Sequence, residues 1–406
     1  MSGVRLKRFF LEAARLIRER RFAALLVKAR RMTKVASRTI PIAQFERAVA
    51  AAPRLMLLVD AAQGGGAAAA ATRSAADWRD RGYATLSLGC DPLGRLTAAL
   101  QCPEDPSPRL SGRLTSWPNG SLGANALEVH SLAGFTNPGQ LVGWLSARVR
   151  QGLEVTFWWH DHYLICPTRH LPAPSGWYCG LPAVEDCAAC LPDNPHCLDK
   201  PLRGVEMPAW RLQWGELLAQ SAAIRVFSAS SHELLTELWP ALAPKIRVIP
   251  HEVTHIPLTP VAVAPGAPLN IGVIGHIGAH KGAGAVAALA RHIKAGASEA
   301  RITVLGTLDT SVPAGMVTET GAYLPQDLPA LVHEHRVNVL WLPSLWPETF
   351  CFVLHEMKAM GLPILAYDVG AQREFLAGDP KARLLPIHAS PDEVLTAVTD
   401  MRRPVA

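Results

Sequence analysis

The chain has 406 residues and carries 40 Lys and Arg against 34 Asp and Glu, a formal net charge of +6. This length exceeds what one hydrophobic core usually fills, so we expect two or three domains. The 49% hydrophobic and 18% charged fractions exclude a wholly disordered chain. No continuous apolar stretch reaches 18 residues, so the sequence predicts no membrane-spanning helix.

The positive charge is concentrated at the N-terminus. Residues 1–40 hold twelve Lys or Arg and two Glu, a net +10, whereas the rest holds 28 basic and 32 acidic residues, a net −4. Apolar residues recur there at helical spacing, and the intervening arginines exclude the apolar core of a secretory signal. Three interpretations stay open: a helix lying on an anionic membrane, a helix packed on the protein body, or a nucleic-acid-binding arm.

Strands and helices alternate after the arm. In the first half the sequence predicts strands over 54–60, 84–88, 126–131, 153–161 and 224–230, with helices over 67–81 and 139–151. Residues 253–268 are rich in proline and poor in charge, which is typical of an extended linker. In the second half it predicts strands over 270–277, 301–305, 337–342, 363–368 and 382–387, with helices over 281–295, 326–335 and 352–360. Such alternation produces parallel sheets covered by helices, and a cleft at the carboxyl ends of the strands.

Two glycine turns follow predicted strands and precede helices. In the second half the turn contains Gly278 and Lys281, and in the first half it contains Gly65 and Gly66. A glycine turn at a helix N-terminus presents backbone N–H groups and a positive dipole end, which suit a diphosphate. Neither turn matches a Walker pattern or completes a G-x-G-x-x-G fingerprint, which counts against kinase and ordinary dinucleotide-binding functions.

Two carboxylates, Glu348 and Glu356, lie eight residues apart across a predicted loop and helix start. A carboxylate can accept hydrogen bonds from both hydroxyls of a vicinal diol, so ribose is a natural partner for one of them. The other can orient a second hydroxylated group.

The surroundings of this pair resemble a known family. A strand ending in Pro-Ser, a Pro-Glu-x-Phe loop, a helix containing Glu, a Gly-Leu-Pro turn and a strand followed by Asp-Val-Gly-Ala occur in order over 343–374, after the Gly278–Gly282 turn and the Gly321-Ala322-Tyr323 segment. This order, with its E-x7-E motif, resembles retaining family 4 glycosyltransferases and covers roughly 130 residues. The resemblance implies an α/β GT-B fold, two Rossmann-like domains facing across a cleft.

The resemblance also implies roles for individual residues. A nucleotide-sugar donor would be held by Gly278, Lys281, Tyr323 and Glu356, with Lys281 at the diphosphate and Glu356 at the ribose. Glu348 and His160 would act at the transferred sugar, and Gly65 and Gly66 would approach phosphate or acceptor. One residue departs from the pattern, because His276 stands where members commonly carry Arg.

The chemistry implied by the family is transfer with retention and without a catalytic metal or other cofactor. Departure of the nucleoside diphosphate would be stabilised by Lys281 and the helix N-terminus. The chain contains no Asp-x-Asp, which disfavours a metal-dependent GT-A enzyme.

Five of the eight cysteines lie between 166 and 197. A Cys-x2-Cys pair with two upstream cysteines is typical of structural zinc, so Cys166, Cys179, Cys187 and Cys190 form the predicted quartet. A similar cysteine run occurs in a subset of family 4 enzymes of polysaccharide assembly. Free thiols, an iron–sulfur cluster and disulfides are the alternatives.

The combined hypothesis is a cytoplasmic glycosyltransferase, peripheral to the membrane, acting on a glycan that is lipid-linked. Its parts would be the arm 1–40, an acceptor domain 41–252 with the cysteine-rich insertion 162–203, the linker 253–268 and a donor domain 269–406. The rivals are a zinc-containing nucleic-acid-binding protein, and a GT-B nucleotide-sugar epimerase or inactive homologue. The net −4 of residues 41–406 counts against nucleic acid as a partner.

Overall fold

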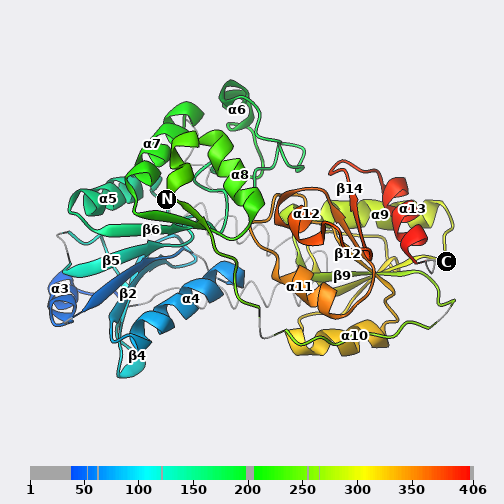
Figure 1. The fold of residues 1–406 in the computed structure, drawn as a ribbon, viewed down its shortest axis with the longest axis horizontal. Coiled ribbons are helices and arrows are strands. Elements are labelled where there is room, and N and C mark those ends of the chain that lie inside the picture. Colours follow the sequence, from blue (N-terminus) through cyan, green and yellow to red (C-terminus); the bar gives the residue numbers. More distant parts are fainter. Residues whose placement is uncertain are drawn as a thin grey trace. The chain divides into compact units, whose positions relative to one another are not determined.

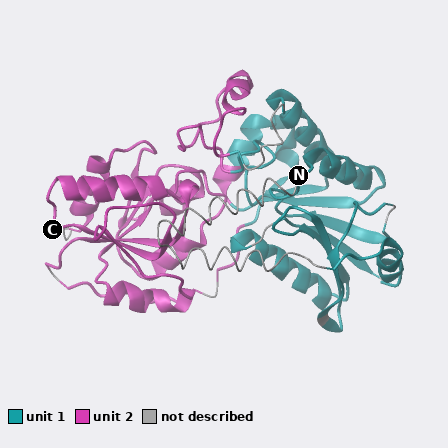
Figure 2. Ribbon diagram, turned by 180° about the vertical axis from the view of Figure 1, so that it is seen from behind, with its two compact units in different colours: residues 1–169, 197–227, 232–249 teal, residues 170–196, 228–231, 250–406 magenta. Residues whose placement is uncertain are grey.

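The computed structural model describes residues 38–52, 54–61, 64–119, 122–197, 205–253, 256–264 and 266–402. The predicted amphipathic helix of the basic arm lies outside this part of the chain. The described residues form two compact units (Figure 2). Unit 1 comprises residues 1–169, 197–227 and 232–249, and unit 2 comprises residues 170–196, 228–231 and 250–406.

Unit 1 is built on an eight-stranded sheet with the order β4-β3-β2-β1-β5-β6-β7-β8. The strands from β2 to β8 in this order are parallel, whereas β3 and β4 continue the sheet as an antiparallel extension. The bounds are β1 Leu55–Val59, β2 Ala84–Cys90, β3 Leu96–Cys102, β4 Asp105–Arg113, β5 Ala124–Val129, β6 Glu154–Trp158, β7 Ala223–Val226 and β8 Ile246–Val248. All five residues of β1 are buried, as expected of a central parallel strand.

Helices cover both faces of this sheet. In Figure 1, α4 (Gly65–Asp80) lies on one face, and α5 (Pro138–Arg150) and α7 (Met207–Gln220) lie together on the other. α4 packs through small residues such as Ala71 and Ala75, which let it approach the sheet closely. The unit also contains α3 (Ile42–Ala50), most of α8 (Ala229–Leu238) and the 3-10 segment η2 (Pro240–Lys245).

Unit 2 contains a six-stranded, entirely parallel sheet with the order β11-β10-β9-β12-β13-β14. The strands are β9 Asn270–Ile277, β10 Arg301–Leu308, β11 Val317–Glu319, β12 Val339–Leu342, β13 Ile364–Tyr367 and β14 Ala382–Leu385. The helical segments are α6 Val184–Cys190, η3 Ala279–Lys281, α9 Ala283–Ala295, η4 Pro325–Asp327, α10 Leu328–Glu334, α11 Phe352–Ala359, α12 Gly370–Leu376 and α13 Pro391–Met401.

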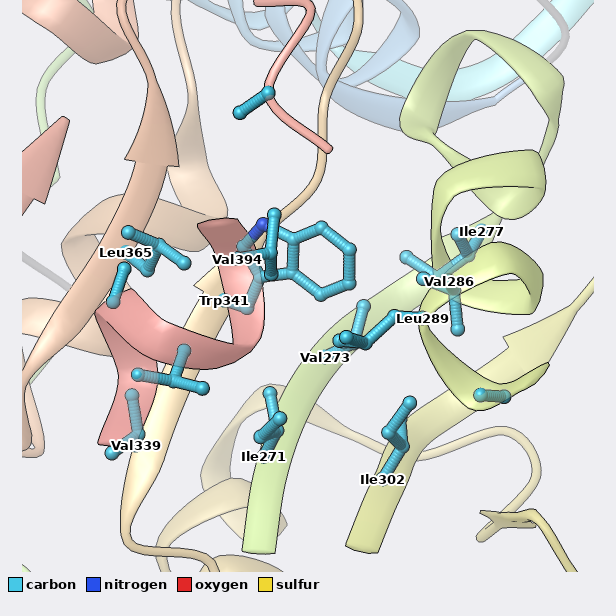
Figure 3. Close-up of a cluster of buried hydrophobic side chains, with 14 of the residues drawn as sticks. Ile271, Val273, Ile277, Val286, Leu289, Ile302, Val339, Trp341, Leu365 and Val394 are labelled. Carbon is cyan, nitrogen blue, oxygen red and sulfur yellow. The ribbon is translucent and has the colours of Figure 1, made fainter. Parts of the chain in front are cut away.

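Two apolar clusters hold the helices of unit 2 to opposite faces of its sheet. One cluster joins α9 and α13 to the strands, and Figure 3 shows Trp341 of β12 within it, near Val273 and Val394. The other cluster joins α10 and α11 to the opposite face. Because both faces of the sheet are covered, its strands are continuous runs of apolar residues. Such runs are easily recognised in the sequence, which is why these strands were predicted well.

The elements predicted from the sequence are present with small shifts at their ends. Strand β9 has the predicted bounds, and the helix predicted over 67–81 is α4. The antiparallel pair β3 and β4 was not predicted. Its second strand contains Pro106 and Pro108, residues that are tolerated at the edge position β4 occupies.

Residues 170–196 differ from the expected division of the chain. The sequence interpretation placed them in an insertion of the first domain, whereas they group with unit 2. Trp177 packs against Tyr367 and His388, with ring centroids 6.1 and 5.3 Å apart. Aromatic contacts of Trp177 thus join the cysteine-rich segment to the second sheet.

Crossing a bilayer requires a helix that is both long and apolar. None of the described helices combines the length and the apolar character of a membrane span.

Candidate functional site

The turn after β9 has a backbone that only glycine can form. Gly278 precedes η3, which ends at Lys281, and Gly282 adopts φ +84° immediately before α9. A Cβ on Gly282 would lie 2.0 Å from the carbonyl oxygen of Pro343, which follows β12. The Leu345 N–H donates to the His280 carbonyl at 2.9 Å, so this turn and the loop after β12 are held together. The predicted phosphate turn is therefore a fixed element at the N-terminus of α9.

The residue that departs from the family pattern is paired with acceptors on or just after β10. His276 Nδ1 lies 2.7 Å from Thr307 Oγ1, and its Nε2 lies 3.1 Å from Asp309 Oδ2. The side chain is 54% exposed. A carboxylate thus stands next to the histidine where a permanent guanidinium was expected, so this corner of the turn carries less positive charge.

Lys281, Glu356 and Tyr323 lie close together around this turn. Glu356 projects from α11, and its Oε2 is buried with no hydrogen-bond partner among the described residues. Burial raises the pKa of Glu356 to about 7, and Lys281 opposes that shift. Burial also raises the pKa of Tyr323, and the nearby Glu356 adds to it. A buried carboxylate oxygen without a donor, beside a lysine, is suited to accept a ligand hydroxyl.

Glu348 is held more tightly than Glu356. It is 4% exposed, and its Oε1 accepts a hydrogen bond from Ser344 Oγ at 2.6 Å. Burial raises the pKa of the Cys351 thiol well above its usual range, with Glu348 contributing. The backbone N–H of Glu348 donates to Gln372 Oε1 at 3.2 Å, and the Glu348 carbonyl accepts from the Ala371 N–H at 2.8 Å. The loop therefore sets Glu348 in one orientation.

In unit 1 the predicted glycine turn begins α4. Gly64, the residue before α4, adopts φ +146°, and Gly65, the first residue of the helix, adopts φ +74°; Gly66 follows it within the helix. Gly64 also lines a cavity of about 590 Å³ between α4 and the strands, whose polar lining includes Asp60, Arg79, Asp91 and Gln101. Unlike Gly282, Gly65 would place an added Cβ with no atom within 4 Å, so its conformation alone favours glycine.

His160 follows β6 and contacts a buried histidine. Its Nε2 lies 3.0 Å from Nδ1 of His130, and its ring centroid lies 4.9 Å from that of Phe227, with the two rings tilted by 31°. His130 Nε2 in turn lies 3.4 Å from Glu128 Oε2. His160 itself is half-buried. The predicted site histidine therefore sits at the outer end of a buried polar chain.

The predicted zinc ligands are divided between the two units. Cys166 belongs to unit 1, and Cys179, Cys187 and Cys190 belong to unit 2. Burial raises the pKa of the Cys179 thiol, and Cys187 and Cys190 add to the shift, so these three sulfurs are near one another. Among the described residues, no group of three or more His, Cys, Asp or Glu is arranged to hold a metal ion. Zinc binding stays a prediction.

Several residues of these sites were missed by the sequence interpretation. They support predicted residues from distant parts of the chain, as Glu128 and His130 do for His160, and Asp309 does for His276. The only signal for Glu128 in the sequence is a charged residue inside an otherwise apolar strand.

No protein-family model matches this sequence, and no curated protein sequence matches it. Solved structures, however, are similar in fold to 86% of the chain. They include sucrose-phosphate synthase from Thermosynechococcus elongatus, with 16% identity, a TM-score of 0.53 and 90% of that chain covered. Anabaena HepE in complex with UDP and glucose matches with 14% identity, a TM-score of 0.52 and 90% covered. The lipopolysaccharide outer core galactosyltransferase WaaB matches with 12% identity, a TM-score of 0.50 and 90% covered. The predicted α/β GT-B fold with two parallel-sheet domains is confirmed.

Proposed function

We propose that this protein is a glycosyltransferase whose donor is a nucleoside diphosphate sugar. The observation that carries the proposal is the buried, unpaired Oε2 of Glu356 beside Lys281 and the turn before α9. In its favour, HepE of similar fold is described with UDP and glucose, and WaaB is a galactosyltransferase. A fold does not by itself determine an activity, so the proposal rests on the chemistry of the side chains at the site.

Each predicted site residue of unit 2 has a role in donor binding. Lys281, Gly278 and the first turn of α9 supply positive charge and N–H groups for the diphosphate. Glu356 accepts hydrogen bonds from the ribose hydroxyls, with Tyr323 beside it. Glu348, fixed by Ser344, orients the transferred sugar. In unit 1, His160 acts at the sugar, and Gly65 and Gly66 approach phosphate or acceptor.

The chemistry we propose is retaining transfer without a catalytic metal. As the bond between the sugar and the diphosphate breaks, negative charge develops on the leaving phosphate. Lys281 and the N-terminus of α9 stabilise that charge because they are already in place. The acceptor hydroxyl attacks the same face of the sugar and passes its proton to the departing phosphate.

We further propose a lipid-linked glycan as acceptor and a peripheral position at an anionic membrane through residues 1–40. The charge of +10 in that arm supports the membrane contact. Flotation with vesicles containing anionic lipid, comparing the full chain with one lacking residues 1–40, tests it. Equal flotation of both would remove the arm from the proposal.

A structural zinc ion at Cys166, Cys179, Cys187 and Cys190 is a separate proposal. Thiolates are the ligands that zinc prefers in structural sites, and three of these sulfurs are near one another in unit 2. Elemental analysis of gently purified protein decides it. A zinc content well below one per chain would leave these cysteines as unmetallated thiols.

Donor binding gives the decisive test of the function. We expect UDP-, GDP- or dTDP-glucose to bind by calorimetry, and Glu356→Ala and Lys281→Ala each to weaken binding by about 10- to 100-fold, the value of a charged hydrogen bond. Glu334→Ala, at an exposed position on α10, is the matched control and should bind normally. Wild-type protein that binds none of these sugars, or Glu356→Ala protein that binds them normally, would overturn the proposal. Product analysis then separates transfer from epimerisation.

A further inference from the structure

A buried glutamine on α12 contacts the loop after β12 on both sides of Pro347. Gln372 is completely buried, and its Nε2 donates to the Trp346 carbonyl at 3.0 Å. Its Oε1 accepts from the Glu348 N–H at 3.2 Å. A backbone N–H only donates and a carbonyl only accepts, so these two contacts fix the orientation of the amide. Gln372 therefore bridges two peptide groups that lie 24 and 26 residues earlier in the chain.

The backbone at the start of α12 contacts the same loop. The Ala371 N–H donates to the Glu348 carbonyl at 2.8 Å. Gly370 adopts φ +60°, and a Cβ there would lie 2.4 Å from Pro347 Cα and 2.6 Å from the Glu348 nitrogen. Only glycine allows this conformation and so close an approach. The peptide groups on both sides of the Glu348 Cα are thus held by α12.

The other end of this loop is held by the turn before α9. A Cβ on Gly282 would lie 2.0 Å from the Pro343 carbonyl oxygen, so the two backbones are in close contact. The Leu345 N–H donates to the His280 carbonyl at 2.9 Å. Main-chain contacts therefore hold residues 343–348 at both ends, to the predicted diphosphate turn on one side and to α12 on the other.

The carboxylate of Glu348 is held as well as its main chain. Ser344 Oγ donates to its Oε1 at 2.6 Å, and Ser344 and Glu348 are 1% and 4% exposed. Burial raises the pKa of the Cys351 thiol, Glu348 adds to the rise and Lys281 opposes it, so both charged residues lie near this thiol. The carboxylate that we assign to the transferred sugar thus has a fixed position near the lysine that we assign to the diphosphate.

We propose that Gln372 is a positioning residue that holds Glu348 at the distance from the diphosphate turn at which the sugar of the donor lies. Its contribution is then specific to the sugar, because a nucleotide sugar reaches Glu348, whereas a bare nucleoside diphosphate ends at the turn. Loss of the Gln372 contacts lets the loop shift, and a shift of about 1 Å is enough to impair such a contact. The role toward the sugar rests on the proposed function, whereas the hold of α12 on the loop does not.

Amide hydrogen exchange of the full chain tests the hold on the loop, with mass spectrometry resolving the Glu348 N–H. We expect slow exchange in the wild type, faster exchange in Gln372→Met and no change in Gln220→Met. Methionine keeps the length of the side chain but loses both hydrogen bonds, and the control residue Gln220 is exposed at the end of α7. Rapid exchange in the wild type, which needs no variant to fold, would overturn the proposal, as would unchanged exchange in folded Gln372→Met.

Calorimetry with two ligands tests the role toward the sugar. The ligands are the nucleotide sugar that the wild type binds (UDP-, GDP- or dTDP-glucose) and its bare nucleoside diphosphate. We expect Gln372→Met and Ser344→Ala each to weaken binding of the nucleotide sugar about tenfold, the value of a charged hydrogen bond, and to leave binding of the bare diphosphate unchanged. Gln220→Met should bind both ligands normally. A general loss of structure weakens both ligands alike, so equal losses for the two in Gln372→Met would overturn the proposal, as would normal binding of both.

A double-mutant cycle tests whether Gln372 acts through Glu348. Glu348→Ala should weaken binding of the nucleotide sugar, and Gln372→Met should add no further loss in that background, because the position of the loop matters only when the carboxylate is present. Additive losses would overturn the positioning role. If the wild type binds neither a nucleotide sugar nor a bare diphosphate, the proposed function and the role toward the sugar fail together, while hydrogen exchange still decides the hold on the loop.

Discussion

Each unit contains a glutamate with a buried carboxylate oxygen, and the two carboxylates are in opposite states. Glu128 in unit 1 accepts from Ser74, Trp78 and His130, and its pKa lies below its usual value. Glu356 in unit 2 has a buried oxygen with no partner among the described residues, and burial raises its pKa to about 7. Burial acts in the same direction on both, so the hydrogen bonds decide the difference.

The difference separates a carboxylate that is satisfied within the protein from one that has an oxygen left for a ligand. Glu128 already accepts from three donors and is only 8% exposed, so it is poorly placed to contact a substrate. A carboxylate oxygen left without a donor is costly, and a bound hydroxyl group relieves that cost. Unit 1 therefore satisfies its buried carboxylate internally, whereas unit 2 leaves a carboxylate oxygen for which we propose the donor as partner.

The glycine turns of the two units offer the largest test of this contrast. Gly282→Ala places a Cβ 2.0 Å from the Pro343 carbonyl oxygen at φ +84°, so we expect it to destabilise the protein by about 3 kcal/mol and to weaken donor binding. Gly65→Ala has open space at φ +74° and should cost only about 1 kcal/mol. Urea unfolding and calorimetry measure both.

Gly284→Ala is the control for this pair. Gly284 lies in α9 with no atom within 4 Å of an added Cβ, so alanine should stabilise the helix by up to about 1 kcal/mol. Equal effects of Gly282→Ala and Gly65→Ala would show that the contact with Pro343 does not constrain the turn.

Isosteric substitution of the two glutamates should have opposite effects on the free energy of unfolding. At pH 8, Glu128→Gln should destabilise by about 2 kcal/mol, because it breaks a satisfied buried charge. Glu356→Gln should stabilise the ligand-free protein, because the wild-type carboxyl is easier to ionise in the unfolded chain. The rise of its pKa from 4.5 to about 7 corresponds to about 3 kcal/mol, which partial exposure reduces to about 2.

The effect of each substitution on the free energy of unfolding should depend on pH. The raised pKa of Glu356 contributes stability that is fully present below about pH 4.5 and is lost as the pH rises to about 7. The gain from Glu356→Gln should therefore vanish at pH 4.5. The lowered pKa of Glu128 contributes stability at high pH that is lost on acidification. The destabilisation caused by Glu128→Gln should therefore also become smaller at low pH. If Glu128→Gln and Glu356→Gln changed the free energy of unfolding in the same direction at pH 8, the comparison would be contradicted.

The same contrast between the two units explains which parts of the candidate site could be predicted from the sequence. The turn at Gly278, Lys281 and the Glu348–Glu356 pair follow one another along the chain in unit 2, so their order and spacing were readable before the structure. The sequence could not show that Ser74 meets Glu128 across 54 residues, or that His130 meets His160 across 30. Those contacts depend on sheet order and on which face α4 covers, and neither follows from local periodicity.

The division of the chain could not be predicted for a related reason. Residues 170–196 follow a unit 1 strand in sequence, but Trp177 finds its aromatic partners at Tyr367 and His388, about 200 residues later. The sequence interpretation did not predict the hairpin of β3 and β4, and the proline residues of β4 weaken the local signal for its second strand. In both cases tertiary position outweighed the local signal.

Donor binding should release protons if the ionised Glu356 carboxylate is the form that accepts ribose. With a pKa of about 7, we expect affinity to rise about tenfold between pH 6 and pH 8. Calorimetry near pH 7 in buffers of different ionisation enthalpy should show about half a proton released per donor bound.

Glu356→Gln isolates the contribution of the carboxyl group, because the amide keeps the shape of the side chain and cannot titrate. The variant should bind donor more weakly, release no proton and show no tenfold rise in affinity between pH 6 and pH 8. Proton release that persists in Glu356→Gln would assign the titration to another group.

The smallest effect concerns His276. Arginine at this position can keep the pair with Asp309, now 3.1 Å from the ring, and adds a permanent charge near the diphosphate turn. Because the side chain is 54% exposed, water screens the gain, and we expect His276→Arg to raise donor affinity only about threefold. Half-molar salt should remove most of that gain. His292→Arg, in the last turn of α9 beside Asp392, adds the same charge at the other end of the helix and should leave affinity unchanged. A loss of affinity in His276→Arg would mean that the His276–Asp309 pair itself shapes the turn, so that the departure from the family pattern is a property of donor choice rather than a weakened site.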